Sequence, residues 1–241
     1  MIQKSRAIVL HQLKYSETSV ITTLYTETFG RQSYLINGIR SSKSKQKTGL
    51  LQPLFLLEID AYHKQGRDLQ RMKEFKMCHV FQTIPFDISK STMAMFLAEL
   101  LNKVLHSEER DVNLFDFIFD SIHYFDTIKE GASNFHLWFL VQLLGYLGFK
   151  LHNNYMLPQS WFDMKTGSFV QYRPSYPKTP DLEESKKIAE LIGLNADDFH
   201  QYAITGNQRA RLLEILIEYY TLHIDGMGNI NSLKVLQEIF H

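Results

Sequence analysis

The sequence predicts an α+β protein, in which a small antiparallel β-barrel of the OB-fold type is followed by an all-helical domain with an irregular hairpin insert. Five short runs of β-branched and aromatic residues fill the first part of the chain. The apolar spacing becomes helical after residue 85, and the sign of the charge changes near residue 80. We therefore expect two domains, 1–80 and 81–241, with the insert at 153–180.

An uneven distribution of charge supports this division. Residues 1–80 contain 13 Lys and Arg against 6 Asp and Glu, whereas residues 81–241 contain 13 against 20. The formal net charge of the whole chain is zero, so a basic module is joined to an acidic one. The basic module favours a polyanionic partner, and the acidic module indicates a different one.

The strands of the barrel are predicted from composition and turn signals. They are expected at residues 7–13, 19–26, 33–36, 50–62 and 69–81. Asn37-Gly38 is a strong turn pair after the third strand, and Gln65-Gly66 marks the turn before the fifth. Pro53 indicates that its end of the fourth strand is an edge, a bulge or the strand start. An SH3-like barrel of similar strand count is the alternative.

Helical spacing dominates the rest of the chain. Phe96, Leu100 and Val104 belong to an apolar face that repeats every three or four residues, with Ser89 or Ser91 as the candidate N-cap. Further helices are expected at residues 112–128, 134–147, 180–192, 207–223 and 233–240. Residues 153–179 break this pattern, and residues 161–172 within them have the pattern of a tight hairpin.

A basic loop is the strongest candidate for a binding site. Residues 40–47 contain Arg40, Lys43, Lys45 and Lys47 without one acid. If the loop is extended, the alternate lysines project to one side and present a row of ammonium groups to a phosphate backbone. The alternative is a solvated loop without a ligand.

Two residues of the third strand extend this candidate site. Arg31 follows the turn into the strand and is expected near the base of the loop, while Tyr34 alternates with Leu35 and is expected to face outward and stack on a base. The alternative for Tyr34 is a place in the core. Other candidates for the footprint or for stacking are Arg6, Lys14, Tyr15, Tyr25, Phe55, Arg67, Arg71, Lys73 and Lys76.

Several function classes lack the residues they need. The chain has no GxxxxGK[ST], GxGxxG, HExxH or GxSxG pattern, so we expect a binding protein and not an enzyme. Its one cysteine, Cys78, cannot form an internal disulfide, which suits a reducing cytoplasm. The N-terminus lacks the pattern of a secretion signal, and the apolar runs are too short for a membrane helix.

Five segments of the chain form a recognisable series: residues 5–15, TETFG at 26–30, NGIRSSKS at 37–44, LLQPLF at 50–55 and LLGYLGF at 143–149. Together they resemble the RecO family of bacterial DNA repair proteins, and they follow the family's order over nearly the whole chain. The resemblance implies an OB barrel joined to a helical domain, which agrees with the periodicity.

The resemblance also implies a function and partners. Members bind single- and double-stranded DNA, anneal complementary strands and, with RecR, help to load RecA onto DNA coated by single-strand-binding protein. The helical domain is expected to contact RecR and the acidic tail of single-strand-binding protein, in a cytoplasmic, nucleoid-associated location. Arg209 and Arg211 are candidate partner-binding residues, because bases at the start of a helix oppose its dipole. A purely structural role is the alternative.

One departure from the family concerns zinc. Many members carry four cysteines after the glycine-rich helix, whereas residues 153–172 contain none. We therefore expect no zinc and no other cofactor. Trp161, Phe162, Phe169 and Tyr172 are expected to form an aromatic cluster in its place. Rival functions are an OB-fold protein that binds RNA or the ribosome, a protein-interaction scaffold and, more distantly, a nuclease.

Overall fold

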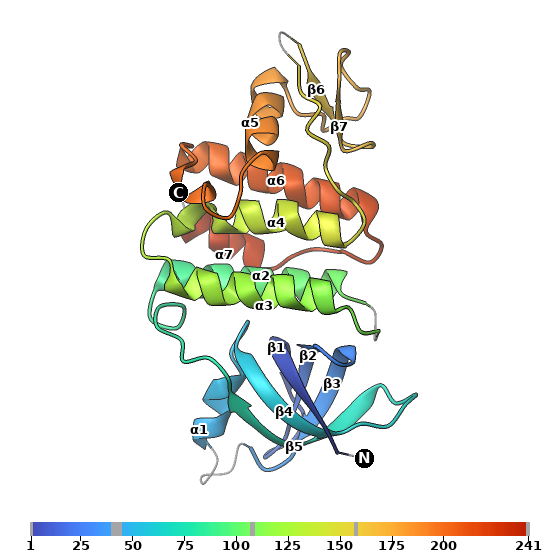
Figure 1. Ribbon diagram of the computed structural model, residues 1–241, viewed down its shortest axis with the longest axis vertical. Coiled ribbons are helices and arrows are strands. Elements are labelled where there is room, and N and C mark those ends of the chain that lie inside the picture. Colours follow the sequence, from blue (N-terminus) through green and yellow to red (C-terminus); the bar gives the residue numbers. More distant parts are fainter. Residues whose placement is uncertain (1, 40–44, 107–108, 157–158, 240–241) are drawn as a thin grey trace. The chain divides into compact units, whose positions relative to one another are not determined.

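The computed structural model describes residues 2–39, 45–106, 109–156 and 159–239 (Figure 1). The side chains of residues 45 and 46 lie outside the described part. Internal contacts divide the chain into two compact units, Met1–Thr127 and Ile128–His241.

The first unit begins with a closed five-stranded barrel. Its strands are β1 (Ile2–Lys14), β2 (Val20–Thr26), β3 (Gly30–Ile36), β4 (Leu56–Tyr62) and β5 (Leu69–Met77). They close in the order β1-β2-β3-β5-β4, and β3 pairs with β5 in parallel while the other pairs are antiparallel. This topology confirms the predicted OB-type barrel.

The segment between β3 and β4 differs from its prediction in two ways. From Lys45 to Thr48 the chain forms a short helix, α1, followed by the 3-10 turn η1 (Gly49–Leu51), so the lysine segment is helical there and not extended. The fourth strand begins at Leu56 and not at residue 50. Buried Leu54 has a φ of 62° and its N–H donates to the Val9 carbonyl (2.8 Å), beside a bulge in β1. This tertiary contact holds a backbone conformation that a strand could not contain.

Two helices complete the first unit. These are α2 (Ile88–Val104) and α3 (Val112–Thr127), and α2 packs against β1. The N-cap of α2 is Asp87, whose carboxylate accepts from the N–H groups of Ser89 and Lys90, so the prediction of a serine cap is wrong. An aspartate one residue before the helix satisfies the same free N–H groups and also favours the helix dipole.

Arg6 of β1 ties the barrel to α3. Its guanidinium pairs with Glu27 (2.9 Å) and with Asp116 (2.7 Å), and lies over the rings of Phe115 and Phe119. The Phe115 ring is 5.9 Å from that of Tyr25 in β2. Arg6 is therefore a structural residue of the first unit.

The second unit is mostly helical. Its helices are α4 (Phe135–Tyr146), α5 (Leu182–Ile192), α6 (Gly206–His223) and α7 (Ser232–Ile239), with 3-10 turns η2 (Ala132–Asn134) and η3 (Phe199–Gln201). Asp181 and Thr205 begin α5 and α6 with capping boxes. α4 is buried along most of its length and packs against α5 and α6, as its apolar composition predicts.

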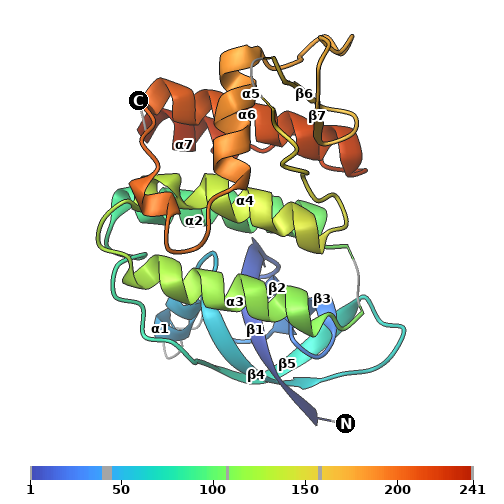
Figure 2. The ribbon, with the colours of Figure 1, turned by 45° about the horizontal axis from the view of Figure 1, so that its top comes forward.

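The insert contains the predicted hairpin, formed by β6 (Trp161–Asp163) and β7 (Ser168–Val170) beside α5 (Figure 2). Buried Phe162 and Phe169 contact each other at 5.3 Å between ring centroids, and Tyr155 and Tyr219 extend the cluster. Tyr172 is 69% exposed and outside it, so that part of the prediction is wrong. The ring follows the end of β7, where the chain turns to solvent.

Candidate nucleic-acid interface

A groove on the outer surface of the barrel gathers cations around an apolar floor. We call it the basic groove; it has a volume of about 950 Å³ and is lined by Leu35, Asn37, Tyr62, Lys64, Arg67, Leu69, Gln70, Arg71 and Lys73. These residues come from the ends of β3 and β4, from β5 and from the turn between β4 and β5, which projects from the barrel (Figure 1). All four cationic side chains in the lining are exposed.

The positive charge of the basic groove is available to a ligand. Within the described part of the chain, none of its four cations forms an ion pair. Asp68 is an exposed acid in the same turn, but it does not line the groove. Exposed, unpaired cations that converge on one concavity are what a polyphosphate chain requires.

The turn that carries Lys64 and Arg67 is organised by one buried side chain. The Gln70 amide, 3% exposed, accepts from the Lys64 N–H (2.9 Å) and donates to the carbonyls of Lys64 (2.8 Å) and Arg67 (3.0 Å). Before the turn, the His63 ring stacks on the Phe29 ring, with 3.8 Å between the ring centroids. The glutamine replaces backbone hydrogen bonds that the turn cannot make by itself, so the backbone that carries Lys64 and Arg67 is fixed.

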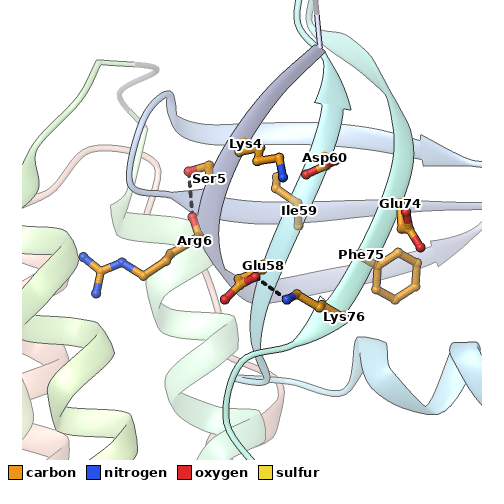
Figure 3. A pocket seen from close by; sticks show the side chains of 9 residues that line it. All are labelled: Lys4, Ser5, Arg6, Glu58, Ile59, Asp60, Glu74, Phe75 and Lys76. Carbon is orange, nitrogen blue, oxygen red and sulfur yellow. Dashed lines mark hydrogen bonds and ion pairs between the residues drawn. The ribbon is translucent and has the colours of Figure 1, made fainter.

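A second concavity on the barrel has a different electrostatic character. This mixed-charge pocket has a volume of about 480 Å³ and is lined by Lys4, Ser5, Arg6, Glu58, Ile59, Asp60, Glu74, Phe75 and Lys76 (Figure 3). Its acids balance its bases, and Lys76 is 2.8 Å from Glu58. Figure 3 shows the Arg6 side chain directed out of the pocket. Balanced charge gives a polyanion no net attraction here.

The structure describes the predicted basic loop only in part. Arg40 and Lys43 lie outside the described residues, as does the side chain of Lys45. Lys47 is exposed on α1. The Thr48 hydroxyl donates to the Ile39 carbonyl (3.1 Å), which holds the two ends of the loop together close in sequence to Asn37 of the basic groove.

The two predicted site residues of β3 are placed differently from expectation. Arg31 is half-buried and donates from Nη2 to Asn102 Oδ1 of α2 (3.2 Å), so it is directed at α2. Tyr34 is completely buried in the barrel, and burial raises the pKa of its hydroxyl. It does alternate with Leu35, but the tyrosine faces inward, so its assignment as a base-stacking residue is corrected.

The other predicted aromatic and basic residues divide by exposure. Tyr25 and Phe55 are buried, whereas Tyr15 is 61% exposed at the turn after β1. Of the predicted basic residues, Arg67, Arg71 and Lys73 line the basic groove. Arg6 and Lys76 are paired with acids, and Lys14 is exposed outside the groove.

Sequence reasoning missed Tyr62 and Lys64 as site residues. Tyr62 ends β4 and is 42% exposed, and Lys64 begins the following turn. The signal that could have found them is the turn sequence KQGR at 64–67, which places Lys64 two residues before Gly66 and Arg67 directly after it. Only the closed barrel brings this turn beside Leu35 of β3.

Arg209 and Arg211 of α6 have partners within the second unit. Arg209 Nε donates to Asn134 Oδ1 (2.9 Å), and burial lowers the pKa of its guanidinium. Arg211 pairs with Glu184 (2.6 Å) and Glu214 (3.2 Å). These contacts account for two bases near the start of a helix without an external ligand.

The described residues contain no cluster of three or more His, Cys, Asp or Glu side chains that could hold a metal ion. In the insert, the Phe162 N–H donates to the Ser185 hydroxyl (2.9 Å), and Asn154 bonds both backbone groups of Phe169. Apolar packing and these bonds stabilise the hairpin.

Among the helices that the structure describes, none has the length and apolar character that a bilayer requires.

Comparisons with known proteins agree on one family. The family model described as recombination protein O N terminal matches residues 1–81, and the one described as recombination protein O C terminal matches residues 85–233. The chain is 38% identical to the DNA repair protein RecO of Phocaeicola vulgatus and 38% identical to that of Bacteroides fragilis, with full coverage of both chains in each pair. It is 35% identical to that of Flavobacterium psychrophilum, covering 98% of each chain.

Proposed function

This chain belongs to the RecO family of DNA repair proteins, and we propose that it acts as a recombination mediator that binds DNA through the basic groove and the neighbouring loop 40–47. The observation that carries this proposal is the set of four exposed, unpaired cations around one groove of an OB-type barrel. The loop adds further bases that begin three residues after Asn37 of the groove.

The proposed mechanism is binding without bond-making. Lys and Arg neutralise phosphates on a bound strand and release its counterions, so affinity falls steeply as salt rises and depends little on base sequence. Two complementary strands repel each other less when their phosphates are neutralised. The basic surface therefore promotes annealing of single-stranded DNA, and the same contacts accept duplex DNA.

The finer role follows from the family resemblance. We propose that the helical region binds RecR and the acidic tail of single-strand-binding protein, and that the complex helps to load RecA onto coated DNA in the nucleoid. Arg209 and Arg211 are left out of the proposed surface, because both have partners within their own unit. Calorimetric titration with purified RecR, and with a peptide of that tail, tests each partner separately.

The central test is binding of single-stranded DNA at several salt concentrations. Replacing Arg67 and Arg71 by Glu should weaken binding by tenfold or more and make affinity less dependent on salt, since each lost phosphate contact removes about 0.7 from the slope of log K against log salt. The matched control replaces Lys165 and Lys186, exposed on the second unit, by Glu and changes the net charge equally. Equal affinities of the two double variants would contradict the groove.

The loop is tested by a separate variant in which Lys43, Lys45 and Lys47 are replaced by Glu. We expect weaker binding of single- and double-stranded DNA, because the loop supplies sequence-independent phosphate contacts. An unchanged affinity would remove these lysines from the site. Tighter binding of structured RNA than of single-stranded DNA in competition would instead indicate the RNA-binding rival, and the absence of any salt-dependent DNA affinity would indicate a protein scaffold.

A further inference from the structure

We infer that Tyr62 is a base-stacking platform, and that the basic groove therefore selects a single strand over a duplex. This inference rests on the proposed function, because it names the form of nucleic acid that the groove prefers. It assigns a binding role to a residue outside the basic loop, at the end of β4.

The position of Tyr62 is fixed by its neighbours on three strands. Tyr62 is in register with Ile2 of β1 on one side and with Arg71 of β5 on the other. Arg71 is in turn in register with Leu35 of β3. The row on the outer surface of the barrel thus places an aromatic ring, a guanidinium and an aliphatic side chain side by side, and Leu69, 38% exposed, lies in the same groove.

This combination of groups fits an unstacked nucleotide. The exposed Tyr62 ring and the two leucines offer apolar surface that water solvates poorly, while Lys64, Arg67 and Arg71 offer charge for the phosphates. A single strand presents both base faces and phosphates. A duplex keeps its base faces stacked within the helix, so it can use the cations but gains little from the apolar floor.

Acidic residues limit the site on one side. Two residues before Tyr62, Asp60 is in register with Glu74 of β5 and with Lys4 of β1. Glu58 is the next outward acid on β4. A phosphate displaced in that direction enters the mixed-charge pocket, where acids balance bases and it gains no net attraction. The strand is therefore held at the end of the barrel where Tyr62 and the cationic turn lie.

The test compares ligands that share their phosphates but differ in their bases. Dissociation constants at one salt concentration are measured for oligo-dT, for an abasic strand of equal length and for a duplex of equal length. The proteins are the wild-type full chain, Tyr62→Ala, Tyr62→Trp and, as a matched control, Tyr172→Ala, which removes an exposed tyrosine from the second unit. Thermal melting of each variant checks its fold.

We expect wild type to bind oligo-dT at least about fivefold more tightly than the abasic strand, the effect of one stacked base. Tyr62→Ala should remove this preference and leave affinity for the abasic strand and the duplex nearly unchanged. Tyr62→Trp should keep the preference, and its added tryptophan fluorescence should be quenched by oligo-dT but not by the abasic strand. This second measurement decides the matter even if the alanine variant unfolds.

The two levels of the proposal fail differently. If Tyr62→Ala weakens binding of all three ligands alike, or if wild type binds oligo-dT and the abasic strand equally, the platform is wrong while salt-dependent binding keeps the groove. If none of the ligands binds in a salt-dependent manner, the proposed DNA-binding function is itself wrong.

Discussion

Asp126, at the end of α3, is a carboxylate buried in the first unit. Its side chain is completely buried and accepts from the N–H groups of Gln82 (2.7 Å), Thr83 (2.9 Å) and Ile84 (2.9 Å), and it lies 2.8 Å from His79 Nε2. Burial alone raises the pKa of Asp126, but these hydrogen bonds outweigh it and lower the pKa to about 2. The carboxylate thereby fixes the segment that leads from the barrel to α2.

Because of this environment, we expect the free energy of unfolding to fall at low pH. Because the folded-state pKa is below the ordinary value of 3.8, Asp126 contributes its full stabilisation above about pH 4 to 5 and loses it as pH falls through about 2. The contribution is about 2 kcal/mol. We expect Asp126→Asn to lower the free energy of unfolding at neutral pH and to flatten its pH dependence in that window.

Urea titrations at several pH values measure this effect. Asp120→Asn, which changes an exposed carboxylate on the same helix, should keep the wild-type pH dependence. If Asp126→Asn keeps it as well, the buried carboxylate does not carry the acid sensitivity.

For single residues of a strand, the sequence predicts that neighbouring side chains face opposite sides of the sheet, but not which of them faces the barrel interior. Tyr34 and Leu35 face opposite sides of β3 as expected, yet the barrel buries the tyrosine and leaves the leucine half-exposed. Tyrosine is amphipathic and leucine is apolar, so either residue is compatible with the inner or the outer face of a barrel strand. The choice depends on which neighbours fill the barrel interior, and that depends on the closed sheet.

Elements are more predictable than single side chains. β-branched and aromatic composition predicts the five strands, and apolar spacing with terminal signals predicts the helices after residue 85, because these local signals agree with the final packing. The sequence does not predict the structure of residues 45–55, since α1 is only four residues long and the turn at Leu54 depends on a hydrogen bond to Val9 in β1. Such contacts have no local sequence signal.

In the turn between β4 and β5, the hydrogen bonds that organise the backbone can be removed without removing any cation. Gln70→Leu keeps the size and burial of the side chain but removes three hydrogen bonds to the turn. We expect DNA affinity to fall several-fold through lost pre-organisation, while the slope of log K against log salt stays the same because no cation is removed.

Salt titrations of Gln70→Leu and of Gln65→Leu provide the comparison. Gln65 is an exposed residue of the same turn, and its replacement should leave affinity unchanged. A reduced salt slope in Gln70→Leu would mean that phosphate contacts were lost outright and that the glutamine does more than hold the turn.

At the scale of the whole molecule, the charge division and the structural division fall at different places. The charge changes sign near residue 80, and the two family matches meet between residues 81 and 85. The contacts instead group residues up to Thr127 with the barrel. Composition can predict where the basic part of the chain ends, but the contacts that join α2 and α3 to the barrel are tertiary and have no counterpart in composition.

These two divisions predict different behaviour for two fragments. Fragment 1–127 keeps the Asp126 hydrogen bonds and the Arg6–Asp116 pair, so we expect one cooperative thermal transition and salt-dependent DNA binding. Fragment 1–81 has the basic groove but exposes the apolar surface of the barrel that α2 and α3 cover, including Tyr25 against Phe115. It should unfold at lower temperature, and its DNA binding should be lost with the fold. If both fragments melt at the same temperature, the barrel folds independently, and the boundary near residue 80 separates folding domains as well as charge.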